Sequence, residues 1–273
     1  LQNYSYNFKW KHEINNIFEF VSGFQGLMQS NSNDLSAEQV LVADANFLDF
    51  GAYTSLIGTL NQWNLQLGAR YDQRNVKTLE NINQFSKRFN GFNYSIGISR
   101  SSKKFTTRLN ASSGFRPPHI SELLANGVHH ATAQYLIGDE NLSSEQGNQL
   151  DFYLGMHQEH FEIIVNPFIN QINNFVYNNP TGLNDSISGL PIFDIDQTEA
   201  VLQGGDFAIH YHPHIAHWLH LESNYSLLST EDFFGNPLPL IPQNRWNNII
   251  KIDFNSDRKI IIKTISFQYL HYF

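Results

Sequence analysis

The feature that most constrains this chain is an alternation of apolar and polar residues that recurs in segment after segment. In the clearest case Trp63, Leu65 and Leu67 alternate with Asn64 and Gln66. A period of two places successive side chains on opposite faces of a β-strand. The same alternation appears at 4–10, 18–28, 46–60, 92–99, 105–115, 150–157, 161–169, 207–211, 219–227, 246–254 and 265–269. The sequence therefore predicts an all-β chain of about twelve strands.

The connections between these segments alternate between short and long. Short turns are expected near 13–16, 61–62, 101–104, 158–160, 213–217 and 256–258, and long polar loops at 31–45, 79–85, 116–145, 179–191 and 231–243. A barrel whose rims face different compartments has short periplasmic turns and long extracellular loops. We therefore predict an antiparallel up-and-down transmembrane β-barrel, with residues 1–273 forming one region of it.

Composition agrees with a barrel that has a wet interior. Only 15% of the 273 residues are charged, 14% are aromatic, and the polar face of the strands is mostly Asn, Gln, Ser, Thr and Gly. A solvated sheet usually carries more charge, although the aromatic face also fits the core of a soluble sandwich. The net charge of −8 gives no basic face for a nucleic-acid partner. No run approaches the roughly 18 apolar residues of a membrane helix.

The longest interruption of the strand pattern begins at Gly114 and ends at Glu145. Pro117 and Pro118 cannot donate to a strand ladder, so they are expected to end the preceding strand. Arg116 is expected to have a structural role, pairing with Glu145 or Glu122 where the strand meets the loop.

This interruption carries a resemblance to the TonB-dependent outer-membrane receptor family. The matching residues are Gly114-Phe115-Arg116-Pro117-Pro118, Glu122-Leu123 and Gly138-Asp139-Glu140-Asn141-Leu142 with Glu145, and later Pro239-Leu240-Ile241-Pro242-Gln243-Asn244-Arg245. The chain departs from the family pattern at Leu124, where Phe is usual, and at Glu140, where Pro is usual.

The resemblance implies a bacterial outer-membrane receptor that takes up a scarce ligand, such as a metal like zinc or a metal chelate like a siderophore or haem. Receptors of this family have a barrel of about 22 strands, filled by an N-terminal plug. The chain is then expected to be the central part of such a barrel, without the plug and the last strands. The implied partners are outer-membrane lipid, the plug domain, an inner-membrane TonB energy-coupling complex and a small-molecule or metal ligand.

The long loop also supplies the candidate ligand contacts. His119, Glu122, His129, His130, Asp139 and Glu140 lie in it, and His129 with His130 are the candidate metal ligands. Imidazole and carboxylate groups suit transition-metal ions. The competing interpretation is that this loop only packs on neighbouring loops.

A second histidine-rich stretch, residues 210–220, contains His210, His212, His214, His217 and His220. It spans a strand, a short turn and the next strand, so the turn pattern places it at the periplasmic rim. Polar rim or lumen residues are the expected role there, with metal binding as the alternative.

The sequence shows no motif of an enzyme active site. It contains no cysteine nucleophile, Gly-x-Ser-x-Gly or His-Glu-x-x-His, and no phosphate-binding glycine loop. We therefore expect no catalytic residues and no cofactor, apart from a metal or chelate bound as substrate. The alternative is a passive porin or structural barrel. An outer-membrane barrel enzyme comes after it.

Overall fold

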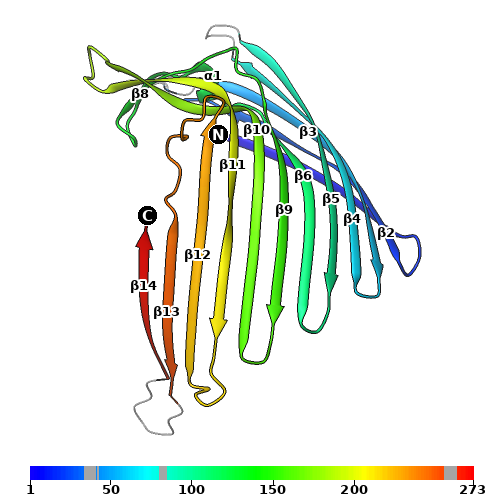
Figure 1. Ribbon diagram of the computed structural model, residues 1–273. Coiled ribbons are helices and arrows are strands. Elements are labelled where there is room, and N and C mark those ends of the chain that lie inside the picture. The colour runs from blue at the N-terminus through cyan, green and yellow to red at the C-terminus, as the bar shows by residue number, and fades with distance from the viewer. Residues whose placement is uncertain (34–40, 42, 80–84, 255–262) are drawn as a thin grey trace.

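The computed structural model describes residues 1–33, 41, 43–79, 85–254 and 263–273. These residues form one curved sheet, with the hairpin turns at its lower end and a short helix at its upper end (Figure 1). In chain order the described elements are β1 (Gln2–Glu13), β2 (Phe18–Asn31), β3 (Ala45–Leu60), β4 (Trp63–Thr78), β5 (Ser86–Ser101), β6 (Phe105–Arg116), α1 (Ile120–Leu124), β7 (Asn126–His129), β8 (Gln134–Ile137), β9 (Glu145–His157), β10 (Phe161–Asn184), β11 (Pro191–Tyr211), β12 (Leu219–Asp232), β13 (Arg245–Asp253) and β14 (Thr264–Tyr272). Within this part of the chain no helix is long and apolar enough to cross a membrane, a finding that does not bear on crossings made by strands.

The predicted up-and-down topology is confirmed. The strands follow one another as β1-β2-β3-β4-β5-β6-β9-β10-β11-β12-β13-β14, and the pairs along this path are antiparallel. The short hairpin β7–β8 lies off this path, and β8 pairs with β11 in parallel. In the described residues β1 pairs only with β2 and β14 only with β13, so the sheet has two edges.

The two faces of the sheet differ in chemistry, as the alternation predicts. Register places Phe8 beside Phe24, Ala52 beside Tyr71, and Tyr71 beside Phe92 on one face. Large apolar side chains of this apolar face are exposed, with Phe92 at 63%. An exposed apolar surface of this extent is unfavourable in water and suits lipid. The opposite, polar face carries the charged and amide side chains of the same strands.

The short turns lie where the sequence predicts them. Strands β3 and β4 are joined by Asn61 and Gln62, and Asn61 has a φ of 53°. Asparagine tolerates the left-handed conformation that a two-residue hairpin turn requires. The turn expected at 256–258 lies outside the described residues.

Two expected loops contain more regular structure than predicted. The segment 116–145 includes α1, β7 and β8, and the expected loop at 179–191 is mostly strand, because β10 continues to Asn184 and β11 begins at Pro191. Their pairing continues through Asn179 with Asp194 and Pro180 with Phe193. Asn, Gly and Pro residues favour turns in sequence terms, but here a long ladder overrides that preference.

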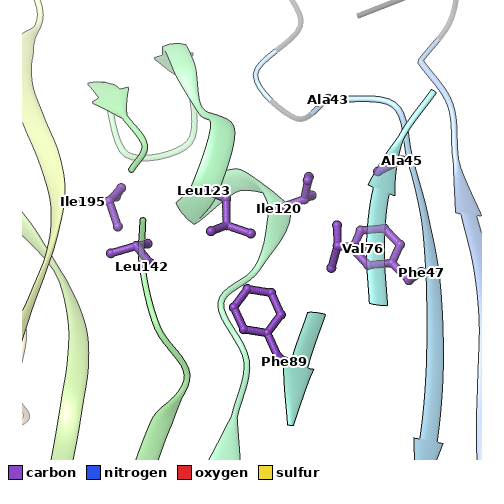
Figure 2. Packing of buried hydrophobic residues seen from close by; sticks show 9 residues of the cluster. All are labelled: Ala43, Ala45, Phe47, Val76, Phe89, Ile120, Leu123, Leu142 and Ile195. Carbon is purple, nitrogen blue, oxygen red and sulfur yellow. The ribbon is translucent and has the colours of Figure 1, made fainter. Parts of the chain in front are cut away.

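A small hydrophobic core lies at the long-loop end, on the polar face of the sheet. Ile120 and Leu123 of α1 are each 1% exposed and pack with Val76, Phe47 and Phe89 of the strands (Figure 2). The helix thus folds down onto the sheet instead of projecting from it. This packing fixes the position of the residues that carry the family-like sequence motif.

Candidate ligand site at the long-loop end

Arg116 joins the end of β6 to the segment that follows it. Its guanidinium donates to Glu145 Oε2 (Nε, 2.6 Å) and Oε1 (Nη2, 2.5 Å), and to both Glu122 oxygens (Nη1, 3.0 and 3.1 Å). Strand β6 ends at Arg116, directly before Pro117 and Pro118. Glu145 also accepts the N–H of Val176 at 2.7 Å. Arg116 therefore contacts both carboxylates that the sequence offered as its partners, and links β6, α1, β9 and β10.

His119 and Glu122 cap the first turn of α1. The N–H of His119 donates to Glu122 Oε2 at 2.7 Å, and His119 Nδ1 accepts the N–H of Ser121 at 3.2 Å. An accepting Nδ1 carries no proton. Desolvation of the ring lowers the pKa of His119, and the positive charges of Arg74 and Arg116 act in the same direction, against Glu122. Both the accepting Nδ1 and the lowered pKa favour the neutral form of this imidazole.

Gly138 and Asp139 dock against the far end of α1. Gly138 N–H donates to Ala125 O at 2.7 Å, and Asp139 N–H donates to Glu122 O at 3.0 Å. A Cβ on Gly138 would lie 2.7 Å from Ala125 N and 2.8 Å from Glu122 O, so only glycine allows this approach. The Gly-Asp pair of the motif is explained by this contact.

Glu140 stands on the outer side of this turn with an exposed side chain. Its backbone carbonyl accepts from Lys87 Nζ at 2.6 Å, as does that of Leu142 at 2.9 Å. Asp139 Oδ1 accepts the N–H and the amide of Asn141, both at 2.9 Å. The backbone here is thus fixed, while the Glu140 carboxylate faces solvent.

His129 and His130 lie apart from this network, at the turn of the β7–β8 hairpin. His129 Nδ1 is 2.8 Å from Thr132 Oγ1, and His130 is exposed. Among the described residues, no cluster of three histidine or acidic ligands within 4.8 Å includes either residue. The structure therefore brings His119, Glu122, Asp139 and the Arg116 network around α1, and leaves the two candidate metal ligands at the tip of the hairpin.

A cavity of about 880 Å³ lies on the polar face beside this network. Phe115 and Pro117 form part of its wall, together with charged and amide side chains of β3, β4 and β5. Arg74 donates to both oxygens of Asp49 at 2.7 and 2.6 Å. The charges in the wall are paired, so the cavity offers hydrogen-bonding groups with little net charge.

The sequence pattern alone does not indicate this cavity. A second ion pair in its wall joins Arg70 Nε to the two oxygens of Asp72 at 2.8 and 2.7 Å, and Asn93 donates to Asp72 Oδ2 at 3.2 Å. The signal present in the sequence is that Arg70 and Asp72 stand on the polar side of the alternation. Charged side chains are unfavourable on the lipid-facing side of a barrel, so both are expected to face the interior.

A single sheet whose main path is antiparallel, with an exposed apolar face, a polar face and folded long connections at one end, defines a transmembrane β-barrel protein. Residues 2–264 match the family described as TonB dependent receptor-like, beta-barrel. The chain belongs to this family, which consists of receptors and transporters.

Solved structures of low sequence identity share the fold. The copper transporter OprC superposes with a TM-score of 0.73 at 14% identity, over 92% of this chain and 40% of that one. The FrpB iron transporter of Neisseria meningitidis (F3-3 variant) gives 0.66 at 13% identity, over 92% and 40%. The Serratia marcescens hemophore receptor HasR, solved with its hemophore and heme, gives 0.69 at 10% identity, over 93% and 49%. The chain thus spans less than half the length of these proteins.

Proposed function

We propose that this chain is part of an outer-membrane receptor for the energy-coupled uptake of a scarce ligand, a metal ion or a metal chelate. Family membership carries the proposal, and the similar structures include a copper transporter, an iron transporter and a hemophore receptor bound to heme. A plug domain, and through it an inner-membrane TonB complex, would supply the energy, and lipid would surround the apolar face. The role is transport and not catalysis.

The architecture of the long-loop end supports a receptor over a passive pore. A porin needs an open polar channel, whereas here α1 and the family-like motif are packed onto the polar face of the sheet. The adjoining cavity has a wall of hydrogen-bonding groups, which suits a bound polar ligand or plug. A folded segment packed beside a polar cavity suits a protein that selects a ligand better than one that lets solutes diffuse freely.

The tip of the β7–β8 hairpin and the exposed side chain of Glu140 are the proposed contacts for the incoming ligand. His130 and Glu140 are exposed there, and the ring of His129 contacts Thr132. His119, Glu122 and Asp139 already have partners within the protein, so they are proposed to shape the site and to contact the ligand only at its edge.

Uptake with and without an energised inner membrane tests the proposal. Cells expressing the complete reading frame should accumulate radiolabelled zinc, ferric siderophore or heme above a deletion strain. An uncoupler should abolish that accumulation if transport is energy-coupled. Accumulation that persists in uncoupled cells would instead indicate a passive porin.

A second experiment tests the hairpin histidines. In the purified receptor, a His129→Ala/His130→Ala double variant should bind the transported metal or chelate at least tenfold more weakly if these residues contact it. Unchanged affinity in a receptor that otherwise binds the ligand removes them from the site.

A further inference from the structure

Six histidines gather at the short-turn end of the sheet, opposite to α1. Five come from residues 210–220, and the sixth is His160, in the turn between β9 and β10. Neighbouring ring centroids are 4.8 to 6.4 Å apart; the six are His160, His210, His212, His214, His217 and His220. The chain has twelve histidines, so half of them occupy this one place.

Three of these histidines already have nitrogens at metal-ligand separations. One nitrogen each of His160, His212 and His217 lies within 4.8 Å of the other two. The Nδ1 atoms of His160 and His212 are 3.5 Å apart. In tetrahedral zinc sites with Zn–N bonds of about 2.0–2.1 Å, ligand nitrogens are separated by about 3.3 Å. Small rotations of the rings would therefore complete the coordination.

A fourth imidazole stands next to this triad. The ring centroid of His214 is 4.8 Å from that of His160 and 5.3 Å from that of His217. His214 is exposed, so it can turn toward or away from the triad. The cluster can thus offer three or four imidazole ligands, with water in the remaining position when His214 is away.

The backbone holds the triad in place independently of any metal. His212 N–H donates to His160 O at 2.9 Å, which ties the β9–β10 turn to the β11–β12 turn. The second turn is closed by Ala216 N–H to Pro213 O at 3.0 Å and Leu219 N–H to Ala216 O at 2.9 Å. Ligands carried on tied turns lose less conformational entropy when an ion binds.

The remaining two histidines form a hydrogen-bonded row behind the triad. Asp253 Oδ2 lies 3.2 Å from His220 Nε2, and His220 Nδ1 lies 3.3 Å from His210 Nε2. When Asp253 accepts a hydrogen bond from His220 Nε2–H, Nδ1 of the same neutral ring carries no proton. His220 Nδ1 can then accept a hydrogen bond from His210 Nε2–H. The row therefore has a consistent pattern of donors and acceptors, and it positions the rings that contact His212.

Two carboxylates lie near the cluster, and each already has a partner. Asp253 faces His220, and Glu162 lies 2.9 Å from His157 on the neighbouring strands. The nearby Lys251 is bound to Asp253 at 3.4 Å, which offsets part of its charge. Imidazole nitrogens are ligands for borderline divalent transition metals, whereas Mg²⁺ and Ca²⁺ take oxygen ligands.

We propose that His160, His212 and His217, with His214 as an optional fourth ligand, bind a divalent transition-metal ion such as Zn²⁺ at the short-turn rim. The ion joins the β9–β10 turn to the β11–β12 turn across the polar face. The site is separate from the long-loop end, so it does not depend on which ligand the receptor takes up.

Metal titration of the protein expressed from its complete reading frame and purified in detergent tests this site. Zn²⁺ is titrated against a chromophoric chelator, and Co²⁺ is used to report tetrahedral nitrogen coordination by its visible absorption. Substitution of an outer-shell partner typically costs about 10- to 100-fold in metal affinity, so loss of a ligand should cost at least about 100-fold. His212→Asn and His217→Asn should each show this loss, and the triple variant with His160→Asn should lose one equivalent of Zn²⁺.

Two controls separate this site from others. His129→Asn/His130→Asn and the exposed His12→Asn should keep the rim equivalent. If the triple variant retains that equivalent, or if it disappears in the His129/His130 variant instead, the proposal is wrong.

Folding of each variant is checked by its heat-dependent gel mobility. Chemical modification of the unmutated protein gives a test that needs no variant. Bound Zn²⁺ should protect His160, His212 and His217 from diethyl pyrocarbonate at least tenfold, measured by peptide mass spectrometry. Equal modification with and without Zn²⁺ would overturn the proposal.

Discussion

Replacing Arg116 with alanine should loosen the segment 117–144 while leaving β6 and β9 paired. Arg116 is the point at which β6, α1, β9 and β10 are joined through two carboxylates. Strand pairing between β6 and β9 uses backbone groups and does not need this side chain. The effect should therefore be local opening of the long-loop end.

The size of the effect follows from what the substitution leaves behind. Glu145 has a side chain only 11% exposed and would keep the N–H of Val176 as its remaining partner here. Two charge-assisted hydrogen bonds of 2.5 and 2.6 Å disappear, each worth about 1.5–3 kcal/mol. Arg116 itself is 43% exposed, so solvent screens part of this. We expect a cost of about 2–4 kcal/mol for local opening, less than for a fully buried pair.

Limited proteolysis under native conditions measures this opening. A cost of about 2–4 kcal/mol raises the open population, and hence the cleavage rate within 117–144, by roughly 30- to 800-fold. Arg116→Lys keeps the charge but loses the bidentate geometry. Its cleavage rate should therefore lie between those of the unmutated protein and Arg116→Ala. Arg88→Ala, which removes an exposed arginine that contacts Asn75, is the matched control.

The coupling between the partners gives the sharpest test. In a double-mutant cycle with Glu145→Gln, Arg116→Ala should cost much less than it does alone, because the buried charge is then gone. Cleavage within threefold of the Arg88→Ala control, or strictly additive effects in the cycle, would refute the reasoning.

Three further predictions concern the same end of the molecule. Leu123→Ala leaves a cavity in the small core and should cost about 2–5 kcal/mol, seen as faster hydrogen exchange in α1; unchanged exchange would contradict the packing. Gly138→Ala drives a Cβ into the backbone of α1 and should cost about 1–3 kcal/mol in the same assay, whereas Gly127→Ala, with nothing within 4 Å, should cost little. The lowered pKa of His119 means that its contribution to stability is present above the ordinary histidine range and is lost as the pH falls toward the folded-state pKa. Proteolysis of 117–144 should therefore accelerate on acidification, and this acceleration should be weaker in His119→Asn, which retains a side chain able to accept from Ser121.

The strand pattern could be predicted from the sequence because it is local. Alternation at residues 63–72 directly indicates which side chains lie on each face of β4, and Asn61-Gln62 indicates the turn before it. These signals need no knowledge of what the strand pairs with. The roles of Pro117 and Pro118 were predictable for the same reason.

The parts that were missed depend on contacts between distant residues. Helix α1 has five residues, too few to show a helical period, and it is held by Val76, Phe47 and Phe89 of strands earlier in the chain. His160 did not stand out because it joins the histidine cluster only through the pairing of β10 with β11. The Arg74–Asp49 pair likewise depends on the register of β3 and β4.

The parallel pairing of β8 with β11 sets an order of events during folding. Tyr135, Leu136 and Ile137 pair with Ile192, Phe193 and Asp194, more than fifty residues later. Strands β9 and β10 lie between β6 and β11 in the sheet, and both are made after β8 and before β11 along the chain. Because closing such a distant contact first would be slow, the β7–β8 hairpin should dock last. Until β11 is in place, the core around Ile120 and Leu123 also lacks Ile195, so the long-loop end is expected to be completed late.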